Sequence, residues 1–429
     1  TGLSPRSGGW VVAVYSWRWN RSLYYSKRLI QTGMKLPILK LRKDQERRIL
    51  AGHLWIYSNE IDTRETPLKE FSPGQQVAIH TQRNKWVAHA YINPRSLISA
   101  RVISRHPTET LDEELLTKRI SNALALRERL FDNRCYRLVY GESDLLPGLV
   151  VDRFGDYLSM QITTAGMAAV QAQIIGVLEK LLEPAGILLR NDTPVRELEG
   201  LEQHVSVAMG EIPERVRLEE NGAHFETSLA EGQKSGWFYD QAGNRERMQR
   251  YIREGDSVLD ICTYAGAWGV TAALAGAAEV HCVDASQSAL EQTRSNAELN
   301  KVQERLETQQ GDVFDVLRKM AAEGRRFDMV ILDPPAFIKR RKDQKQGEQA
   351  YQRLNSLGLE VLKNDGILIT SSCSFHMEQS KLQNVVRQAA VQQNTQLRLL
   401  EFGQQRQDHP VHPAIPETAY LKTLFFHKS

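Results

Sequence analysis

The sequence predicts an α/β protein of two or three domains, the largest of which is a doubly wound sheet in the C-terminal half. Three observations support this fold class. The chain has 429 residues, which exceeds the roughly 100 to 200 residues of a usual domain. From residue 257 onward, apolar strand-like runs alternate with helical segments, as in sheets covered by helices. Before residue 109, short β-like runs are separated by turn residues instead.

Charge is unevenly distributed along the chain. The formal net charge is +3, yet residues 1–33 carry five Lys/Arg and no acid, and residues 34–106 carry thirteen Lys/Arg against six Asp/Glu. A basic front joined to an acidic remainder predicts a module that faces nucleic acid. A solvated basic face without a partner is the alternative.

Composition also excludes some classes of protein. The four cysteines lack metal-ligand spacing, so we expect reduced thiols, no metal site and a cytoplasmic location. No apolar run approaches the roughly 18 residues that span a membrane, so we expect no membrane association.

The first two domains are predicted as follows. Residues 1–33 show no regular periodicity, and we expect a poorly ordered extension. Residues 34–108 predict a small β-barrel, with turns at Pro73-Gly74 and Asn93-Pro94 and with strands at 38–41, 76–79, 86–91 and 98–103. In this module Arg47 and Arg48 precede an aromatic stretch, which suits phosphate contact and base stacking in RNA.

Residues 109–222 predict a central α+β domain without a catalytic cluster, to which we assign a structural or docking role. Its expected elements are a helix over 111–131, a strand-turn-strand unit over 144–156, a helix over 168–182, and strands at 187–190 and 205–208.

Residues 223–429 predict the doubly wound domain. The polar-aromatic segment 226–245 is expected to contact a ligand, with an interdomain linker as the alternative. An Ala-rich helix should end near Ala275, and Ser286 should cap a helix that runs to about Asn300. The expected strands are 257–262, 279–284, 307–314 (ending near Asp312), 329–332, 366–370, 397–401 and 422–426.

Acidic residues follow or end four of these strands. In doubly wound sheets ligands bind at the carboxyl ends of the strands, near the point where the strand order reverses. Asp260, Asp284, Asp312 and Asp333 should meet there, and Gly266 lets the backbone approach a ligand closely. The glycine spacing does not form a pyrophosphate-binding triplet, so the acids favour an adenosine whose tail is a sulfonium amino acid, namely S-adenosylmethionine.

A thiol and an acid predict the chemistry at this rim. Methylation at carbon-5 of a pyrimidine requires attack on carbon-6, ordinarily by a thiolate. Cys373 is placed just past a strand end, and Asp333 would face the N3 atom of the base. The target nucleotide must be unpaired or flipped out. Lys339, Arg340 and Arg341 follow the Asp333 loop and could bind flanking phosphates, or merely be solvated.

These motifs resemble those of Rossmann-like class I S-adenosylmethionine-dependent RNA methyltransferases. The resemblance rests on 260–269, Val283-Asp284, Gly311-Asp312, Asp333-Pro334-Pro335-Ala336-Phe337 and Ser372-Cys373-Ser374. With 141–153 and 232–236, it extends over 34–429 to the bacterial 23S ribosomal RNA cytosine-5 methyltransferase I family.

The resemblance implies a PUA domain, a central domain and a seven-stranded mixed catalytic sheet. It also implies that Cys373 is the nucleophile, that Asp333 contacts the base, and that Asp260, Gly266, Asp284 and Asp312 contact the cofactor. The substrate would be 23S rRNA, and a homodimer is one assembly that we consider. Ala336 stands where related enzymes carry a second cysteine that assists product release.

Two other functions remain open on sequence grounds. An Asp-Pro-Pro segment followed by an aromatic residue also suits methylation of an exocyclic amine, which needs no thiol. A non-catalytic RNA-binding assembly factor with a vestigial cofactor pocket is the second alternative.

Overall fold

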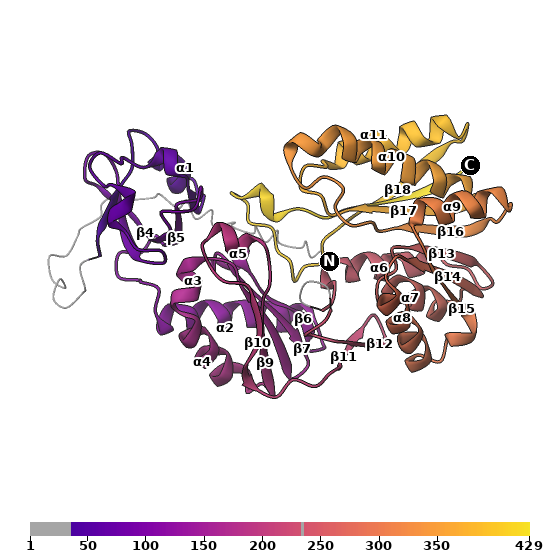
Figure 1. The fold of residues 1–429 in the computed structure, drawn as a ribbon, viewed down its shortest axis with the longest axis horizontal. Coiled ribbons are helices and arrows are strands. Elements are labelled where there is room, and N and C mark those ends of the chain that lie inside the picture. The colour runs from indigo at the N-terminus through magenta and orange to yellow at the C-terminus, as the bar shows by residue number, and fades with distance from the viewer. Residues whose placement is uncertain (1–35, 233–235) are drawn as a thin grey trace, which may run out of the picture. The chain divides into compact units, whose positions relative to one another are not determined.

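The computed structural model describes residues 36–232 and 236–429, which form four sheets (Figure 1). The first sheet has five strands in the order β1-β3-β4-β5-β2, and its apolar side chains, among them Leu39, Ile56, Val77 and Val102, fill one core. A short helix α1 (Glu46–Leu50) follows the first strand. The strands are β1 (Ile38–Lys40), β2 (Trp55–Ile56), β3 (Gln76–His80), β4 (Trp86–Ile92) and β5 (Ala100–Ser104).

The second sheet has the order β10-β9-β8-β7-β6 and is antiparallel except for the β8–β9 pair. Its strands are β6 (Cys135–Tyr140), β7 (Leu149–Phe154), β8 (Tyr157–Ile162), β9 (Gly186–Asn191) and β10 (His204–Gly210). Its helices are α2 (Glu113–Leu130), α3 (Ala165–Ala169), α4 (Gln171–Leu182) and α5 (Val195–Leu198). The helix expected over 168–182 is therefore two helices, which meet at Val170.

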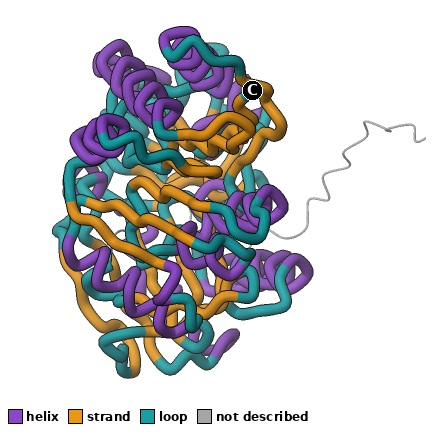
Figure 2. Tube along the Cα trace, turned by 90° about the vertical axis from the view of Figure 1, so that its right-hand side faces the viewer, coloured by secondary structure: helices purple, strands orange, loops and turns teal. Residues whose placement is uncertain are grey.

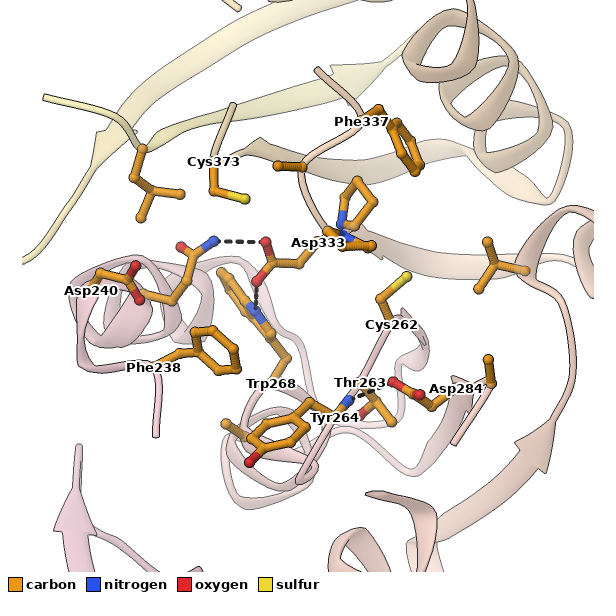
Figure 3. Close-up of a pocket in the computed structure, with 18 of the residues that line it drawn as sticks. Phe238, Asp240, Cys262, Thr263, Tyr264, Trp268, Asp284, Asp333, Phe337 and Cys373 are labelled. Atoms are coloured by element: carbon orange, nitrogen blue, oxygen red, sulfur yellow. Dashed lines mark hydrogen bonds between the residues drawn. The ribbon is translucent and has the colours of Figure 1, made fainter. Parts of the chain in front are cut away.

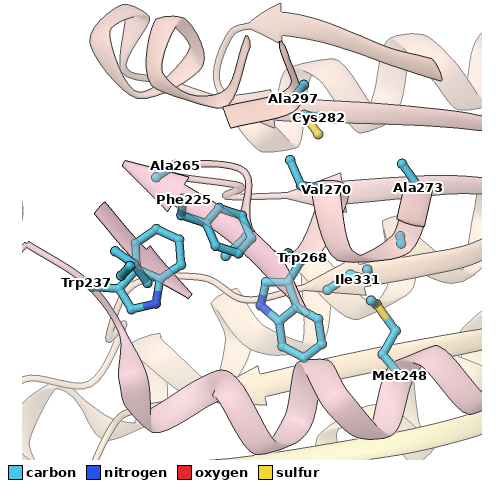
Figure 4. Close-up of a cluster of buried hydrophobic side chains, with 14 of the residues drawn as sticks. Phe225, Trp237, Met248, Ala265, Trp268, Val270, Ala273, Cys282, Ala297 and Ile331 are labelled. Carbon is cyan, nitrogen blue, oxygen red and sulfur yellow. The ribbon is translucent and has the colours of Figure 1, made fainter. Parts of the chain in front are cut away.

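A two-stranded hairpin, β11 (Val216–Glu220) and β12 (Ala223–Thr227), leads into the third part of the chain. Helix α6 (Ala242–Met248) follows it. Phe225 of the hairpin packs against Trp237, with ring centroids 4.8 Å apart, and both belong to the core that surrounds Trp268 (Figure 4). The hairpin thereby packs into the hydrophobic core of the C-terminal sheet.

The largest sheet has seven strands in the order β15-β14-β13-β16-β17-β19-β18, and β19 runs antiparallel to both of its neighbours. This seven-stranded mixed sheet confirms the predicted fold class. The strands are β13 (Ser257–Ile261), β14 (Glu279–Asp284), β15 (Leu306–Gln310), β16 (Phe327–Leu332), β17 (Leu362–Ser372), β18 (Leu397–Gln404) and β19 (Lys422–Lys428).

Helices cover both faces of this sheet (Figures 1 and 2). Successive strand residues point to opposite faces, so Val258 joins the core beneath α7 and α8, whereas Leu259 joins the core beneath α9, α10 and α11. The helices are α7 (Ala267–Leu274), α8 (Gln287–Leu299), α9 (Val313–Ala322), α10 (Gln344–Glu360) and α11 (Gln379–Gln392).

One predicted boundary near the site differs from the structure. The strand expected over 307–314 ends at Gln310, and Asp312 is instead the N-cap of α9, whose first backbone N–H groups its carboxylate accepts. Residues favourable for a strand and for a helix start adjoin here, and the capping side chain sets the boundary. In contrast, Ser286 caps α8 as predicted.

None of the helices in the described ranges is long and apolar enough to cross a membrane. The predicted extension over 1–33 lies outside the described residues.

Candidate active site

A cavity of about 570 Å³ opens at the carboxyl ends of the central strands, where the strand order reverses between β13 and β16. Asp284, Asp312, Asp333 and Cys373 all line it, although they come from four separate segments of the chain. In Figure 3 the Cys373 sulfur and the Asp333 carboxylate lie near one another, and Asp284 lies at the opposite end beyond Cys262. The topology thus brings together the thiol and three of the four acids that sequence reasoning assigned to one rim.

The loop between β13 and α7 forms the floor of the cavity and has an unusual backbone. Cys262 (φ 64°), Tyr264 (φ 51°) and Gly266 (φ 79°) adopt left-handed conformations, which are costly for side chains other than glycine. A β-carbon at Gly266 would come within 2.7 Å of Thr293. The site therefore contains local strain, which the surrounding packing must hold in place.

Asp260 supports this loop from behind and does not line the cavity, nor does Gly266. Its Oδ2 accepts hydrogen bonds from the Gly269 backbone N–H (3.1 Å) and from the Thr263 hydroxyl. The buried Oδ1 of Asp260 has no hydrogen-bond partner among the described residues. Complete burial, aided by the nearby Asp333, raises the pKa of Asp260 to about 7. Direct contact of Asp260 and Gly266 with the cofactor stays a proposal. An alternative proposal is that both residues shape the loop and that the loop contacts the cofactor.

Asp284 and Asp312 form the other end of the cavity. Asp284 accepts backbone N–H groups from Tyr264 (3.0 Å) and Ser286 (2.9 Å). Asp312 accepts those of Phe314 (3.0 Å) and Asp315 (3.2 Å), and the Phe314 ring supplies an apolar wall beside it. These bonds fix both carboxylates at the rim, with their remaining acceptor capacity available to a ligand.

Asp333 lies half-buried between two donors. Gln241 Nε2 donates to its Oδ1 (2.8 Å) and Trp268 Nε1 donates to its Oδ2 (3.0 Å). Asn244 donates to Gln241 Oε1 (2.6 Å), so the Gln241 amide must present its NH₂ group to Asp333. Asn244 in turn donates to Thr423 Oγ1 (3.1 Å). Burial raises the pKa of Asp333 despite the donors, which favours its protonated form.

The Cys373 loop is attached to the Asp333 loop by buried hydroxyls. Cys373 directly follows β17 and is half-buried at the cavity wall, as the sequence predicted. Ser374 Oγ accepts the Ile338 N–H (3.1 Å) and lies 3.1 Å from the Tyr351 hydroxyl, which accepts from Ser372 Oγ (2.9 Å). The thiol and the acid are therefore held by one framework.

A second thiol, Cys262, also lines the cavity, which sequence reasoning did not foresee because it ends an apolar strand. Burial raises its pKa, and the carboxylates of Asp284 and Asp333 raise it further. A thiol surrounded by carboxylates stays protonated and unreactive.

The predicted RNA-contacting cations have different environments. Lys339, Arg340 and Arg341 are exposed, and none of them forms an ion pair with another residue of the described ranges. Arg47 is exposed and pairs with Asp44 (3.0 Å). Arg48 bonds to Glu60 (2.9 Å) and lies over the Tyr57 ring, so it also stabilises its own domain.

Several cavity residues were missed by sequence reasoning. Of the aromatic triplet expected to contact a ligand, Phe238 lines the cavity and Trp237 forms part of its buried wall, whereas Tyr239 lies in the core. Residues 233–235 of that segment lie outside the described residues. Gln241 lies within the segment 226–245 and Trp268 within the motif 260–269, but neither was singled out as a site residue, and Tyr420 belongs to no predicted motif.

The cavity fits a cationic adenosine cofactor. Four carboxylates line it, and its one arginine, Arg245, is paired with buried Glu220 through bonds of 2.5 and 2.8 Å. Carboxylates suit a sulfonium, an ammonium and ribose hydroxyls but repel phosphates. Asp284, Asp312 and Phe314 would hold the nucleoside.

Comparison with known proteins agrees with this chemistry. Residues 202–427 match the model of the S-adenosylmethionine-dependent methyltransferase family, and residues 39–105 match that of a PUA-like domain. Two solved chains share the fold: a SAM-dependent methyltransferase from Streptococcus mutans (TM-score 0.77, 20% identity, 91% of this chain and 100% of that one) and a methyltransferase complexed with SAH (TM-score 0.78, 21% identity, the same coverage). Fold and cavity thus define an S-adenosylmethionine-dependent methyltransferase.

Curated relatives narrow the family. The protein named ribosomal RNA large subunit methyltransferase I from Cronobacter sakazakii is 35% identical over 395 residues, covering 91% of this chain and 98% of that protein. Its namesake from Tolumonas auensis is 37% identical over 393 residues, covering 90% and 97%. The chain belongs to the ribosomal RNA large subunit methyltransferase I family.

Proposed function

We propose that this protein transfers a methyl group to carbon-5 of a cytosine in 23S ribosomal RNA, through a covalent adduct with Cys373. The observation that carries the proposal is the shared cavity, in which Cys373 and Asp333 stand at one end and the acids suited to the cofactor at the other. The names of the curated relatives support ribosomal RNA of the large subunit as substrate.

The residues would divide the chemistry between them. The Cys373 thiolate attacks carbon-6 of the cytosine, and the electron pair displaced from the C5–C6 double bond is delocalised toward N3. A protonated Asp333 donates a hydrogen bond to N3 and so stabilises that charge. The bound cofactor supplies the electrophilic methyl group. Carbon-5 bonds to that methyl group, and a general base then accepts the carbon-5 proton. The electron pair of the C–H bond reforms the C5–C6 double bond as the carbon–sulfur bond breaks, and the pair of the latter bond returns to the Cys373 sulfur.

The direction of the pKa shift of Asp333 supports this reaction over methylation of an exocyclic amine. An exocyclic amine donates hydrogen bonds and is held best by an ionised carboxylate, whereas the N3 atom of cytosine is itself an acceptor and needs a donor. Burial raises the pKa of Asp333, which supports the donor role.

We further propose that residues 34–108 contact the RNA through Arg47 and Arg48, and that Lys339, Arg340 and Arg341 bind phosphates beside the target nucleotide. The exposure of Arg47 and of the three cations after the Asp333 loop supports this assignment. The central domain, 109–222, would fix the position of the RNA-contacting domain, 34–108, relative to the catalytic domain, 223–429.

Replacement of Cys373 tests the proposed chemistry. We expect Cys373→Ala to lower methyl transfer from labelled S-adenosylmethionine to unmodified ribosomal RNA by at least 10³-fold, because the attack on carbon-6 requires the thiolate. Cys262→Ala is the matched control, a second thiol of the same cavity, and should retain most activity. The product is digested and the methylated nucleoside is identified by mass spectrometry.

Three results would contradict the proposal. Retained activity in Cys373→Ala with methyl on an exocyclic nitrogen would favour the amine methyltransferase. Methyl on carbon-5 in that variant would assign the attack to another group. No transfer by the wild-type protein to naked RNA or to large-subunit particles would favour the assembly factor.

A further inference from the structure

Lys422 lies beneath the Cys373 loop and has no place in the chemistry derived so far. It begins β19, where it pairs in register with Ser372 at the end of β17. Only 9% of its surface is exposed. Its Nζ donates to the backbone carbonyls of Ser374 (2.7 Å) and Tyr420 (2.7 Å), which flank the cavity residues Cys373 and Leu421.

The charge of the buried Lys422 ammonium is only partly compensated by its contacts. No carboxylate lies within ion-pair distance of Lys422 among residues 36–232 and 236–429. Two carbonyls occupy two of the three N–H donors of an ammonium group, and their dipoles offset only part of the cost of burying the charge. Burial lowers the pKa of Lys422 to about 8, and negative charge on Cys373 opposes that shift. Lys422 is thus a positive charge bonded to the residue next to Cys373, and the Cys373 thiol is the ionisable group on which that charge can act.

We propose that Lys422 is a positioning residue whose buried ammonium fixes the Cys373 loop and stabilises the thiolate form of Cys373. The inference rests on the nucleophilic role of Cys373 proposed above. Ionisation of the thiol releases its proton to solvent, and below about pH 8 the lysine remains an ammonium that acts as a charge and accepts no proton. No other reactant is needed.

The same charge acts again at the end of the reaction. After carbon-5 loses its proton, the carbon–sulfur bond breaks and both electrons return to sulfur, which leaves as a thiolate. A thiol of lower pKa leaves faster. Lys422 would thereby also assist product release.

Other ionisable groups around this thiol do not supply the charge. Tyr351 from α10 and Tyr420 are neutral hydroxyls, since burial raises the pKa of each. Asp240, which accepts from the Tyr420 hydroxyl, would oppose ionisation of a thiol, and Asp333 would do so only in its ionised form. Arg245, also at the cavity, is neutralised by Glu220, as is Arg137 by Asp152.

The strand contains a matched control for Lys422. Lys428, at the other end of β19, also donates to two backbone carbonyls, those of Leu359 (2.9 Å) and Leu362 (2.7 Å). It does not line the cavity. Replacing it removes an equivalent clamp without touching the Cys373 loop.

Alkylation of Cys373 by iodoacetamide across pH 6 to 10 tests the proposal, with the modified peptide quantified by mass spectrometry. The measurement uses the full chain without RNA or cofactor, so its outcome is independent of whether the protein methylates carbon-5. In Lys422→Met we expect the midpoint of the pH profile to rise by at least about one unit relative to wild type. Lys428→Met should leave it unchanged, and Lys422→Arg should restore it in part.

A Lys422→Met profile that coincides with that of the wild type, in a variant with an unchanged thermal melt, would overturn the proposal. If Lys422→Met does not fold, the pH profile of Cys373 alkylation in the wild-type protein tests the proposal by itself. A midpoint at or above about 8.5, the pKa of an ordinary thiol, would overturn the proposal, and a midpoint at least one unit lower would support it.

Discussion

At the scale of single residues, the site depends on side chains whose ionisation is set by burial. Asp260 illustrates this because its carboxyl is wholly buried and only one of its oxygens accepts hydrogen bonds. Its pKa of about 7 in the folded protein compares with about 3.9 in an unfolded chain. The folded protein therefore binds this proton more tightly than the unfolded chain does.

A pH-dependent loss of stability follows from that difference. The contribution of Asp260 is complete below about pH 4 and is lost as the pH rises through 7, with a slope of up to about 1.4 kcal/mol per pH unit. Asp260→Asn cannot ionise, and its amide oxygen can accept the same bonds from Thr263 and Gly269. Urea unfolding at pH 5, 6, 7 and 8 should show the wild type losing stability relative to this variant until it levels off above pH 7. A constant difference across the series would refute the assignment.

At the scale of elements, the N-cap residues of two helices allow a contribution to stability to be distinguished from a contribution to ligand binding. Asp312 caps α9 and lines the cavity, whereas Ser286 caps α8, accepts the Ala289 N–H (3.3 Å) and does not line it. Both side chains satisfy backbone donors at a helix start.

Removing either cap should cost stability, but only one should cost affinity. We expect Asp312→Ala and Ser286→Ala each to lower the free energy of unfolding by about 1 kcal/mol. Asp312→Ala should also weaken the binding of S-adenosylhomocysteine by about tenfold, because a charged acceptor is lost from the cavity. Calorimetric titration and urea unfolding measure the two quantities. Equal affinities in both variants would remove Asp312 from the cofactor site.

The elements also separate what a sequence can predict from what it cannot. Buried parallel strands are continuous apolar runs, and their carboxyl ends share one edge, so the convergence of Asp284, Asp333 and Cys373 could be predicted. The donors to Asp333 could not be predicted from the sequence. Gln241 lies 92 residues from Asp333, and the orientation of the Gln241 amide depends on Asn244. The strand pairing that brings Lys422 beside Ser372 could not be predicted either.

At the scale of the whole molecule, the C-terminal segment 405–421 links the central sheet to the active site. Arg127 on α2 is fully buried and binds both carboxylate oxygens of Asp144 (2.6 and 2.8 Å). It also donates to the backbone carbonyl of Asp408 (2.8 Å), whose side chain accepts the Arg137 N–H (3.0 Å). The same segment ends at Tyr420 and Leu421 in the cavity wall.

Breaking this link should destabilise the protein strongly. Arg127→Ala leaves a buried carboxylate on Asp144 without its partner, for which we expect a loss of about 3–5 kcal/mol in the free energy of unfolding. Arg134→Ala, which removes a pair between exposed side chains of Arg134 and Asp156 (3.3 Å), should cost less than about 1 kcal/mol. Urea unfolding compares the two. Similar losses would mean that the buried pair contributes no more than a surface pair.

The antiparallel strand β19 has a consequence for how this family can diverge. Lys422 and Thr423 are neighbours and so point to opposite faces of the sheet, one toward the Cys373 loop and the other, through Asn244 and Gln241, toward Asp333. A slip of one residue would exchange the two side chains. An insertion or deletion that shifts the phase of β19 would therefore misalign the thiol and the acid together.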